Sequence, residues 1–322
     1  MSTVGLFRVF QISFILNKVL LPRNMGKRSM NTIKEHFYHY VKTLQDKITQ
    51  EMQILDPDLV LHEDIWQRTD HAGHPGGGGT TRAFKGELFE NAGVNTSCVH
   101  GKIDPQFAKH LQGTGDEMWA AGISLIIHPR NPRIPTVHAN FRMIHQGDKF
   151  WFGGGADLTP YYPHESDFSH FHGVWKKAAG SKYDEMKKTC DDYFNNSHRG
   201  IEMRGIGGIF FDHFNTGHVE KDVSEVYHLA DHFIESYFPI VRNRLSESWT
   251  EADEDFMLHR RGRYVEFNLL HDRGTLFGLK TNGRVDSILI SLPARCKFSY
   301  QYRPVPGSLH EKMWGYYSPK AW

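Results

Sequence analysis

The stretch Val137-His138-Ala139-Asn140-Phe141-Arg142-Met143 decides how the middle of this chain folds. Apolar and polar residues alternate along it, as in a β-strand with one face against a core. The polar face then carries the imidazole of His138, the amide of Asn140 and the guanidinium of Arg142. Such groups together can bind a carboxylate and transfer a proton. The alternative is an edge strand with ordinary solvated polar residues, and the pattern alone leaves both open.

A second alternating stretch, residues 122–128, precedes this strand and predicts its neighbour. A proline-containing loop at 128–135 separates the two. Strands that are consecutive in sequence usually pair in space. Pairing them would place Ser124 and His128 on the face that carries His138, Asn140 and Arg142.

Other segments predict helices at both ends of these strands. Thr32-Ile33-Lys34-Glu35 has the pattern of a capping box, and apolar residues follow it at helical spacing, which predicts a helix over 32–55. Ser181 is predicted to cap a helix running toward His198. Residues 223–246 predict one helix bent at Pro239.

Later segments predict more strands, at 264–270, 275–280 and 285–291, with Asn282-Gly283-Arg284 as a turn. Because strands run together instead of alternating with helices, the predicted fold class is α+β. We expect a broad, largely antiparallel sheet with helices on both sides. Residues 32–322 are expected to form a single domain.

Residues 1–31 form a basic N-terminal extension, with no acidic residue before Glu35. It is either a targeting leader of the mitochondrial type or an untidy extension, with initiation at Met25 or Met30. We expect a cytoplasmic protein, or a mitochondrial one if residues 1–30 act as a presequence. The apolar stretch from Val4 to Leu21 is broken by polar and charged residues, so no transmembrane segment is expected.

The composition excludes several classes of protein. The net charge is +1 without a long basic run, which argues against nucleic-acid binding. The three cysteines lie far apart, so they predict neither a disulfide framework nor a Cys-x-x-Cys zinc site. Twenty-two phenylalanines among 322 residues supply ample material for a large core.

Two glycine-rich stretches stand out. Gly76-Gly77-Gly78-Gly79 lacks the Gly-Lys-Ser/Thr ending of a phosphate loop, so we expect a flexible or tightly turned loop near a ligand. Gly153-Gly154-Gly155 precedes Asp157 in an aromatic setting. This is either a glycine-rich turn or a partly desolvated pocket where Asp157 acts on an N–H group.

Twenty-one histidines raise the question of a metal site. No recognised ligand spacing is present. On a helix, the side chains of His170 and His172 would diverge. A divalent metal is therefore possible but not favoured.

Several uncommon strings occur in one order: Phe89 to Asn95, Val99-His100-Gly101, His128-Pro129, Pro135 to Asn140, Trp151 to Tyr162, Cys190 to Phe194, Arg204 to Gly208, and Arg260 to Gly278. Together they resemble the oxygen-dependent coproporphyrinogen III oxidase family over about residues 32–322. The resemblance implies a homodimer whose interface includes 264–299. It also implies oxidative decarboxylation of two propionates of coproporphyrinogen III to vinyls, giving protoporphyrinogen IX. Oxygen would be the co-substrate, and no cofactor is expected.

By this resemblance, His138 matches the family's proton donor. Substrate-contact positions are matched by Ser124, Asn140, Arg142, Asn282, Gly283 and Arg284. We expect Arg142 and Arg284 to hold propionates, and Asp157 to face the pyrrole N–H groups and polarise or deprotonate one. Positions sometimes assigned as metal ligands correspond to His128, His138, His172 and His198.

One departure from the family is His213, which stands where an Asp is common and weakens the case for a paired carboxylate at 212–213. Two other functions stay open. One is a metal-dependent oxygenase acting on a related acidic substrate. The other is a tetrapyrrole carrier without catalysis.

Overall fold

A single seven-stranded sheet organises the computed structural model, which describes residues 29–108, 111–280 and 283–322. Neighbouring strands are antiparallel and lie side by side in sequence order, from β1 to β7. The fold class is therefore α+β, as the sequence predicts. The strands are β1 (Val60–Thr69), β2 (Pro75–Lys85), β3 (Phe89–Lys102), β4 (Glu117–Pro129), β5 (Thr136–Gln146), β6 (Lys149–Thr159) and β7 (Gly208–Phe214).

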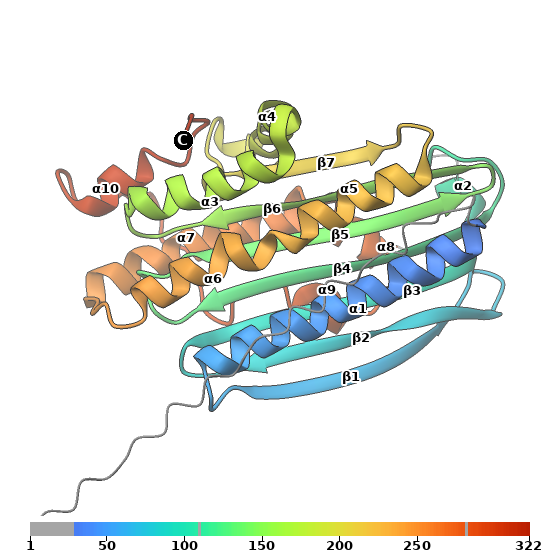
Figure 1. Cartoon of the computed structure of the whole chain (residues 1–322). Coiled ribbons are helices and arrows are strands. Elements are labelled where there is room, and N and C mark those ends of the chain that lie inside the picture. Colours follow the sequence, from blue (N-terminus) through green and yellow to red (C-terminus); the bar gives the residue numbers. More distant parts are fainter. Residues whose placement is uncertain (1–28, 109–110, 281–282) are drawn as a thin grey trace, which may run out of the picture.

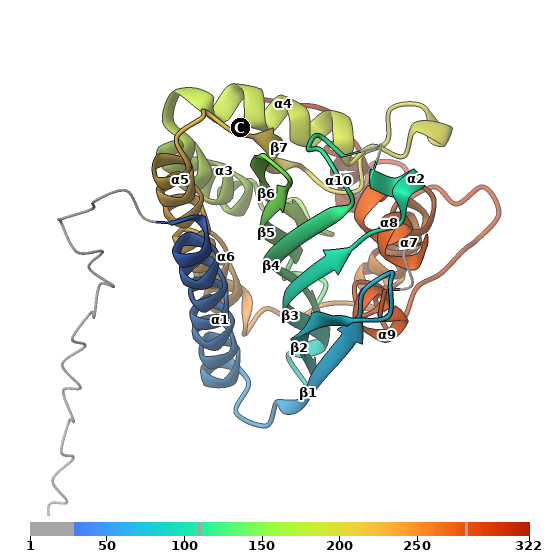
Figure 2. The ribbon, with the colours of Figure 1, turned by 90° about the vertical axis from the view of Figure 1, so that its right-hand side faces the viewer.

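Helices cover both faces of the sheet (Figures 1 and 2). On one side lie α1 (Met30–Leu55), α3 (Glu165–Ala179), α5 (Val219–Asp231) and α6 (Phe233–Arg244). On the other side lie α7 (Glu251–Leu270), α8 (Arg273–Lys280) and α9 (Val285–Leu289). Three further helices lie around the sheet, α2 (Pro105–Ala108), α4 (Tyr183–Tyr193) and α10 (Leu309–Trp314).

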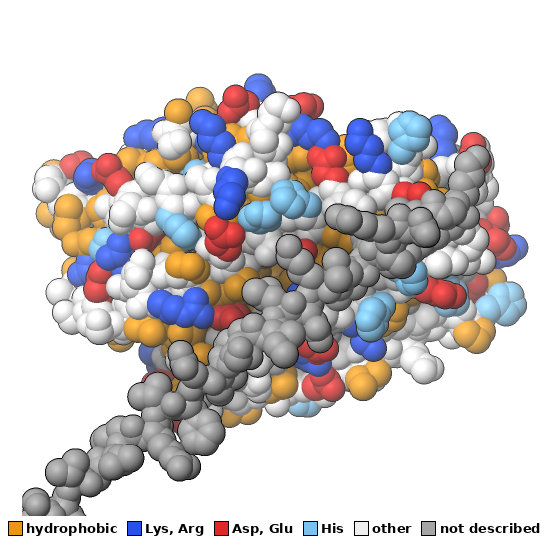
Figure 3. Space-filling model, in the orientation of Figure 1, with side chains coloured by type: hydrophobic (Ala, Val, Ile, Leu, Met, Phe, Trp, Pro, Cys, Tyr) orange, Lys and Arg blue, Asp and Glu red, His pale blue; other side chains and the backbone are white. Residues whose placement is uncertain are grey.

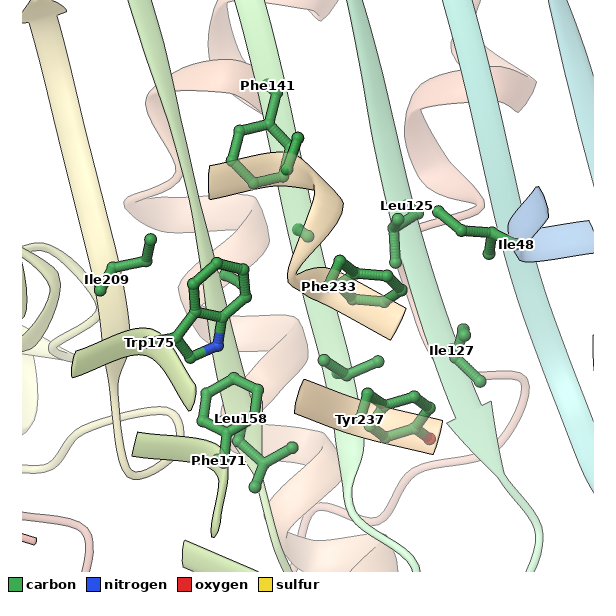
Figure 4. Close-up of a cluster of buried hydrophobic side chains, with 14 of the residues drawn as sticks. Ile48, Leu125, Ile127, Phe141, Leu158, Phe171, Trp175, Ile209, Phe233 and Tyr237 are labelled. Atoms are coloured by element: carbon green, nitrogen blue, oxygen red, sulfur yellow. The ribbon is translucent and has the colours of Figure 1, made fainter. Parts of the chain in front are cut away.

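The main core lies between the sheet and the first helix layer. Figure 4 shows Phe233 and Tyr237 of α6 beside Leu125 and Ile127 of β4. These side chains are at most 2% exposed. Burial of a large apolar side chain contributes roughly 1.5–3 kcal/mol, so this layer fixes which face of each strand points inward.

Strand register confirms the predicted polar face. Ser124 pairs with Asn140, and His138 pairs with Ile126 on one side and Asp157 on the other. Paired residues project from the same face of a sheet. The odd-numbered residues in the middle of β4 and β5, such as Leu125 and Phe141, point into the main core.

The predicted strands at 264–270, 275–280 and 285–291 are wrong, because these residues lie in α7, in α8, and in α9 with the turn that follows it. Helix α7 is hard to recognise because it buries Arg260 and Arg261 completely. These arginines form ion pairs with Glu202 and Glu90. A helix with charged residues on its buried side has no clear apolar period.

Helix boundaries differ from three further predictions. Helix α1 begins at Met30 with Ser29 as its cap, so the capping box predicted at Thr32 is wrong. The helix predicted over 223–246 is two helices that meet at His232, and Pro239 lies inside the second. Helix α4 ends at Tyr193 and does not reach His198.

The predicted glycine loop at 76–79 is also wrong, because these glycines lie within β2. A Cβ atom on Gly79 would lie 2.6 Å from the ring of Trp66, so the glycine leaves room for the indole. Gly153 to Gly155 likewise lie inside β6, which excludes the turn.

Residues 1–28 and 281–282 lie outside the described residues, and with them most of the predicted N-terminal extension and Asn282. Among residues 29–108, 111–280 and 283–322, no helix combines the length and apolar character needed to cross a membrane. Acidic and basic side chains are interspersed on the face that carries α1, α5 and α6 (Figure 3).

Candidate active site

The centre of the candidate site is a hydrogen bond between side chains of neighbouring strands. His138 of β5 lies 2.9 Å from Asp157 of β6, measured from Nδ1 to Oδ1. The carboxylate accepts a hydrogen bond from Nδ1–H, which leaves Nε2 of the imidazole for another partner. The His138 side chain is 18% exposed and that of Asp157 only 2%, so the imidazole is the accessible end of the pair.

Arg204, in the segment before β7, holds Asp157 from the other side. Its Nη2 donates to both carboxylate oxygens at 2.8 and 3.0 Å. The arginine side chain is 2% exposed, and its Nη1 donates to Asn268 of α7 at 2.7 Å. Its guanidinium also lies 4.2 Å from the ring centre of Phe194 and 4.3 Å from that of Tyr264. The site therefore rests on a desolvated charge pair packed among aromatic rings.

This arrangement sets the charge of Asp157. Burial acts to raise the pKa of Asp157, but the charge of Arg204 and the hydrogen bond from His138 outweigh it. The pKa of Asp157 is therefore below its ordinary value. A carboxylate that stays ionised can orient the imidazole and stabilise its protonated form.

Arg142 lies further along β5 on the same face. Its Nη1 donates to Asn140 at 3.0 Å and its Nη2 to Asp212 of β7 at 3.0 Å. The guanidinium rests on Gly153, where a Cβ atom would lie 2.8 Å from Nε and Nη2. The side chain is 35% exposed, so Arg142 can still meet a ligand.

The segment around α9 covers the adjacent part of this face. Ser287 hydrogen-bonds through Oγ to Thr81 and through its carbonyl oxygen to Asn95. At the start of α9, Arg284 forms an ion pair with Asp64 of β1. Gly283 precedes it between two helices rather than two strands, so the predicted hairpin turn is wrong. Ser124 is exposed on β4, beside Asn140.

The four histidines considered as metal ligands have separate environments. His128 hydrogen-bonds to Thr136 and to the carbonyl of Ser291, and it is fully buried. His172 bonds to Tyr183 and the carbonyl of Ile206, whereas His198 pairs with His271 and Glu266. Within the described ranges, no three His, Cys, Asp or Glu side chains gather in a metal-binding group.

Comparison with known proteins decides the family. The family model for coproporphyrinogen III oxidase matches residues 36–322. The chain is 44% identical to the oxygen-dependent coproporphyrinogen-III oxidase of Coxiella burnetii over 287 residues, covering 85% of this chain and 91% of the relative. It is 39% identical to the protein of the same name from Prochlorococcus marinus over 331 residues, covering 92% of this chain and 95% of that relative. The chain belongs to the coproporphyrinogen III oxidase family.

As a coproporphyrinogen III oxidase family member, the chain has a site that was only partly visible in the sequence. Alternation places His138, Asn140 and Arg142 on one face, and the structure brings Asp157 to them. Arg204, Asn268 and Asp212 were not predicted as site residues. Arg204 does occur within a string that resembles the family, which was the available signal.

Proposed function

We propose that this chain catalyses the oxygen-dependent oxidative decarboxylation of two propionates of coproporphyrinogen III, giving the two vinyl groups of protoporphyrinogen IX in haem biosynthesis. Its membership of the family supports this function. The observation that carries it is the pair of His138 and Asp157 on the sheet face that also presents Arg142. This face offers a proton-transfer group beside a cation for a carboxylate.

Each turn of the proposed reaction converts one propionate. The side chain loses carbon dioxide and a hydrogen from its β carbon, and a carbon–carbon double bond forms. The two electrons released reduce one oxygen molecule to hydrogen peroxide, which also takes up two protons. An electron-rich pyrrole can react with oxygen directly, so the proposal needs no resident redox cofactor and no metal.

Particular residues support these steps. His138 donates or carries a proton through its accessible Nε2, while Arg142 and Arg284 hold propionates. Ser124 and Asn140, with Gly283 and the neighbouring Asn282, are the remaining substrate contacts. Burial of Asp157 and its bonds to His138 and Arg204 favour action on His138 over the direct contact with pyrrole N–H groups that the sequence suggested.

The test uses metal-stripped protein incubated with coproporphyrinogen III in air and under argon. Vinyl products are followed by fluorescence after oxidation to porphyrins. Product in air and none under argon is the expected result. Product that returns only on adding a metal would favour a metal-dependent oxygenase, and porphyrin binding without any turnover would favour a carrier.

We also propose that residues 32–322 act as one domain within a homodimer whose interface includes 264–299. Large apolar side chains are exposed there, among them Leu269, Leu270 and Phe298, at 41%, 57% and 61%. Exposed apolar surface of this kind is typical of an interface. Sedimentation of the wild-type protein and of the Leu270→Glu variant tests this. We expect a dimer for the wild type and a weakened dimer for the variant, and a monomeric wild-type protein would contradict the proposal.

For location, we propose the cytoplasm, with mitochondria as the alternative if residues 1–30 act as a presequence. That stretch carries basic residues and no acid. Imaging of a fluorescent protein fused to residues 1–34 distinguishes the two compartments.

A further inference from the structure

Asp212 of β7 lies between two arginines that come from different parts of the fold. Its Oδ1 accepts a hydrogen bond from Arg142 of β5 at 3.0 Å, and its Oδ2 lies 3.5 Å from Nη2 of Arg273 in α8. Asp212 is 18% exposed, whereas Arg142 and Arg273 are 35% and 61% exposed. A single carboxylate thus lies between two cations that are both partly exposed on the surface of the single chain.

Each arginine is also held by contacts that do not involve Asp212. Arg142 rests on Gly153 and donates to Asn140. The backbone N–H of Arg273 donates to the Tyr193 hydroxyl at 3.0 Å, and its guanidinium lies 4.8 Å from the Tyr193 ring centre. The two arginines therefore keep supports when another carboxylate takes the place of Asp212.

The local backbone around Asp212 is unusual. The next residue, His213, has φ of 56°, a left-handed conformation that is uncommon for residues other than glycine. Its N–H donates to Oδ1 of Asp212 at 3.0 Å. Strained conformations of this kind cluster at functional sites, where the surrounding structure maintains them.

We propose that Asp212 is the resident counter-ion of a carboxylate-binding site formed by Arg142 and Arg273, and that a substrate propionate displaces it. The proposal rests on the proposed function, which supplies a substrate with four propionates. A propionate carries the same carboxylate group as Asp212 and can take the same guanidinium contacts. Arg284, the other predicted propionate-binding arginine, likewise has an acidic partner, Asp64.

A resident counter-ion gives the site a specific property. Asp212 competes with the substrate, so it weakens propionate binding and keeps it reversible. A reaction that uses two propionates in turn needs such release, because the intermediate with one vinyl must present its second propionate. Asp212 thus acts as a positioning residue that sets affinity, and it does not contact the reacting carbon atoms in this proposal.

The test is Asp212→Asn, which removes the negative charge and keeps the size of the side chain. Binding is measured by fluorescence titration with coproporphyrin III, the fully oxidised tetracarboxylate. We expect its Kd to fall roughly three- to thirty-fold, since one like charge is removed beside the bound carboxylate. The uncharged tetra-amide of the same porphyrin should bind both proteins equally. Asp192→Asn is the matched control, because Asp192 pairs only with Lys188 on an exposed face of α4 in the contacts described.

Unchanged or weaker binding of coproporphyrin III by Asp212→Asn would overturn the proposal, because a residue that merely holds the arginines in place predicts that result. Asp212→Ser provides a second charge-removing variant if the first does not fold. In an Arg273→Gln background, the gain from Asp212→Asn should shrink, and a full gain there would also contradict the site. Turnover of coproporphyrinogen III by the wild-type protein is measured in parallel, so failure of the proposed function is seen separately.

Discussion

At the scale of single residues, Asp157 is the acid whose surroundings matter most. Both oxygens are used by Arg204, and one is shared with His138. Removing the charge of Asp157 therefore affects two neighbours. His138 loses the acceptor that fixes its tautomer, and Arg204 becomes a buried cation without its carboxylate.

We predict that Asp157→Asn lowers turnover at least about 100-fold, the usual range for loss of oriented acid–base catalysis. It should also lower the free energy of unfolding by about 3–5 kcal/mol, as expected when one partner of a buried ion pair is removed. Oxygen consumption and urea unfolding measure the two effects. Asp192→Asn is again the control, and full turnover by Asp157→Asn would refute the role of this acid.

Some residues of the site can be found from sequence and others cannot. Alternation is a local signal, so it identifies His138, Asn140 and Arg142 within one strand. Asp157 stands out as a lone acid after three glycines. Arg204 lies 47 residues from Asp157 and its partner Asn268 another 64 residues on, so their contacts depend on tertiary packing that no local pattern records.

At the scale of elements, Gly153 of β6 leaves the space in which the guanidinium of Arg142 from β5 lies. A Cβ atom on Gly153 would lie 2.8–2.9 Å from three guanidinium atoms of Arg142. The far end of a flexible side chain can move out of the way at little cost to the fold. A methyl group at position 153 should therefore weaken ligand binding by Arg142 and change the stability of the fold little.

We therefore predict that Gly153→Ala raises KM, by roughly ten- to a hundred-fold, because displaced binding groups have effects of this size. The midpoint of urea unfolding should change little. Gly173→Ala, in α3 with no atom within 4 Å of the added Cβ, is the matched control. It should stabilise the protein by about 0.5–1 kcal/mol and leave KM unchanged. Equal KM values for Gly153→Ala and the wild type would show that substrate binding by Arg142 does not depend on the space above Gly153.

Elements with a regular apolar period can be predicted from the sequence. Elements that contain buried arginines or several glycines cannot, because these residues break the period. The apolar spacing of Ile33, Phe37 and Val41 identified α1, and alternation identified β4 and β5. Helix α7 was missed because Arg260 and Arg261 are buried by ion pairs, and β2 because Trp66 fills the space above Gly79. In both cases, a residue type that is unfavourable there, a buried arginine in a helix or a glycine in a strand, is stabilised by a contact with a residue from another segment.

At the scale of the whole molecule, two buried histidines link stability to pH. Burial and the charge of Arg261 hold the pKa of His128 well below its ordinary value. Burial and the charge of Lys187 lower the pKa of His172 to about 3. Both are neutral in the folded protein, whereas in the unfolded chain they take up protons as the pH falls through about 6.5. The unfolded state then binds more protons, so stability decreases as the pH falls below that value.

We predict that the free energy of unfolding decreases between pH 6 and pH 4.5 by about 1.4 kcal/mol per pH unit for each of these histidines. His172→Gln should remove one such contribution from the slope. Urea unfolding at a series of pH values measures it, with His62→Gln on the edge strand as the control. A slope unchanged by His172→Gln would contradict the neutral state of this residue.

The contacts that hold the site join segments that are further apart in sequence than most paired strands of the sheet. Strands β1 to β6 follow one another along the chain and pair in that order, so most of the sheet can grow from nearby contacts, whereas β7 joins only after α3 and α4. Asp157 gains its counter-charge only when Arg204 arrives, and Arg204 is fixed only when α7 brings Asn268. Loops that close over longer separations form later. Catalytic competence should therefore be the last property acquired in refolding, with β-sheet circular dichroism recovering before enzymatic activity, and simultaneous recovery would show that sheet and site form in one step.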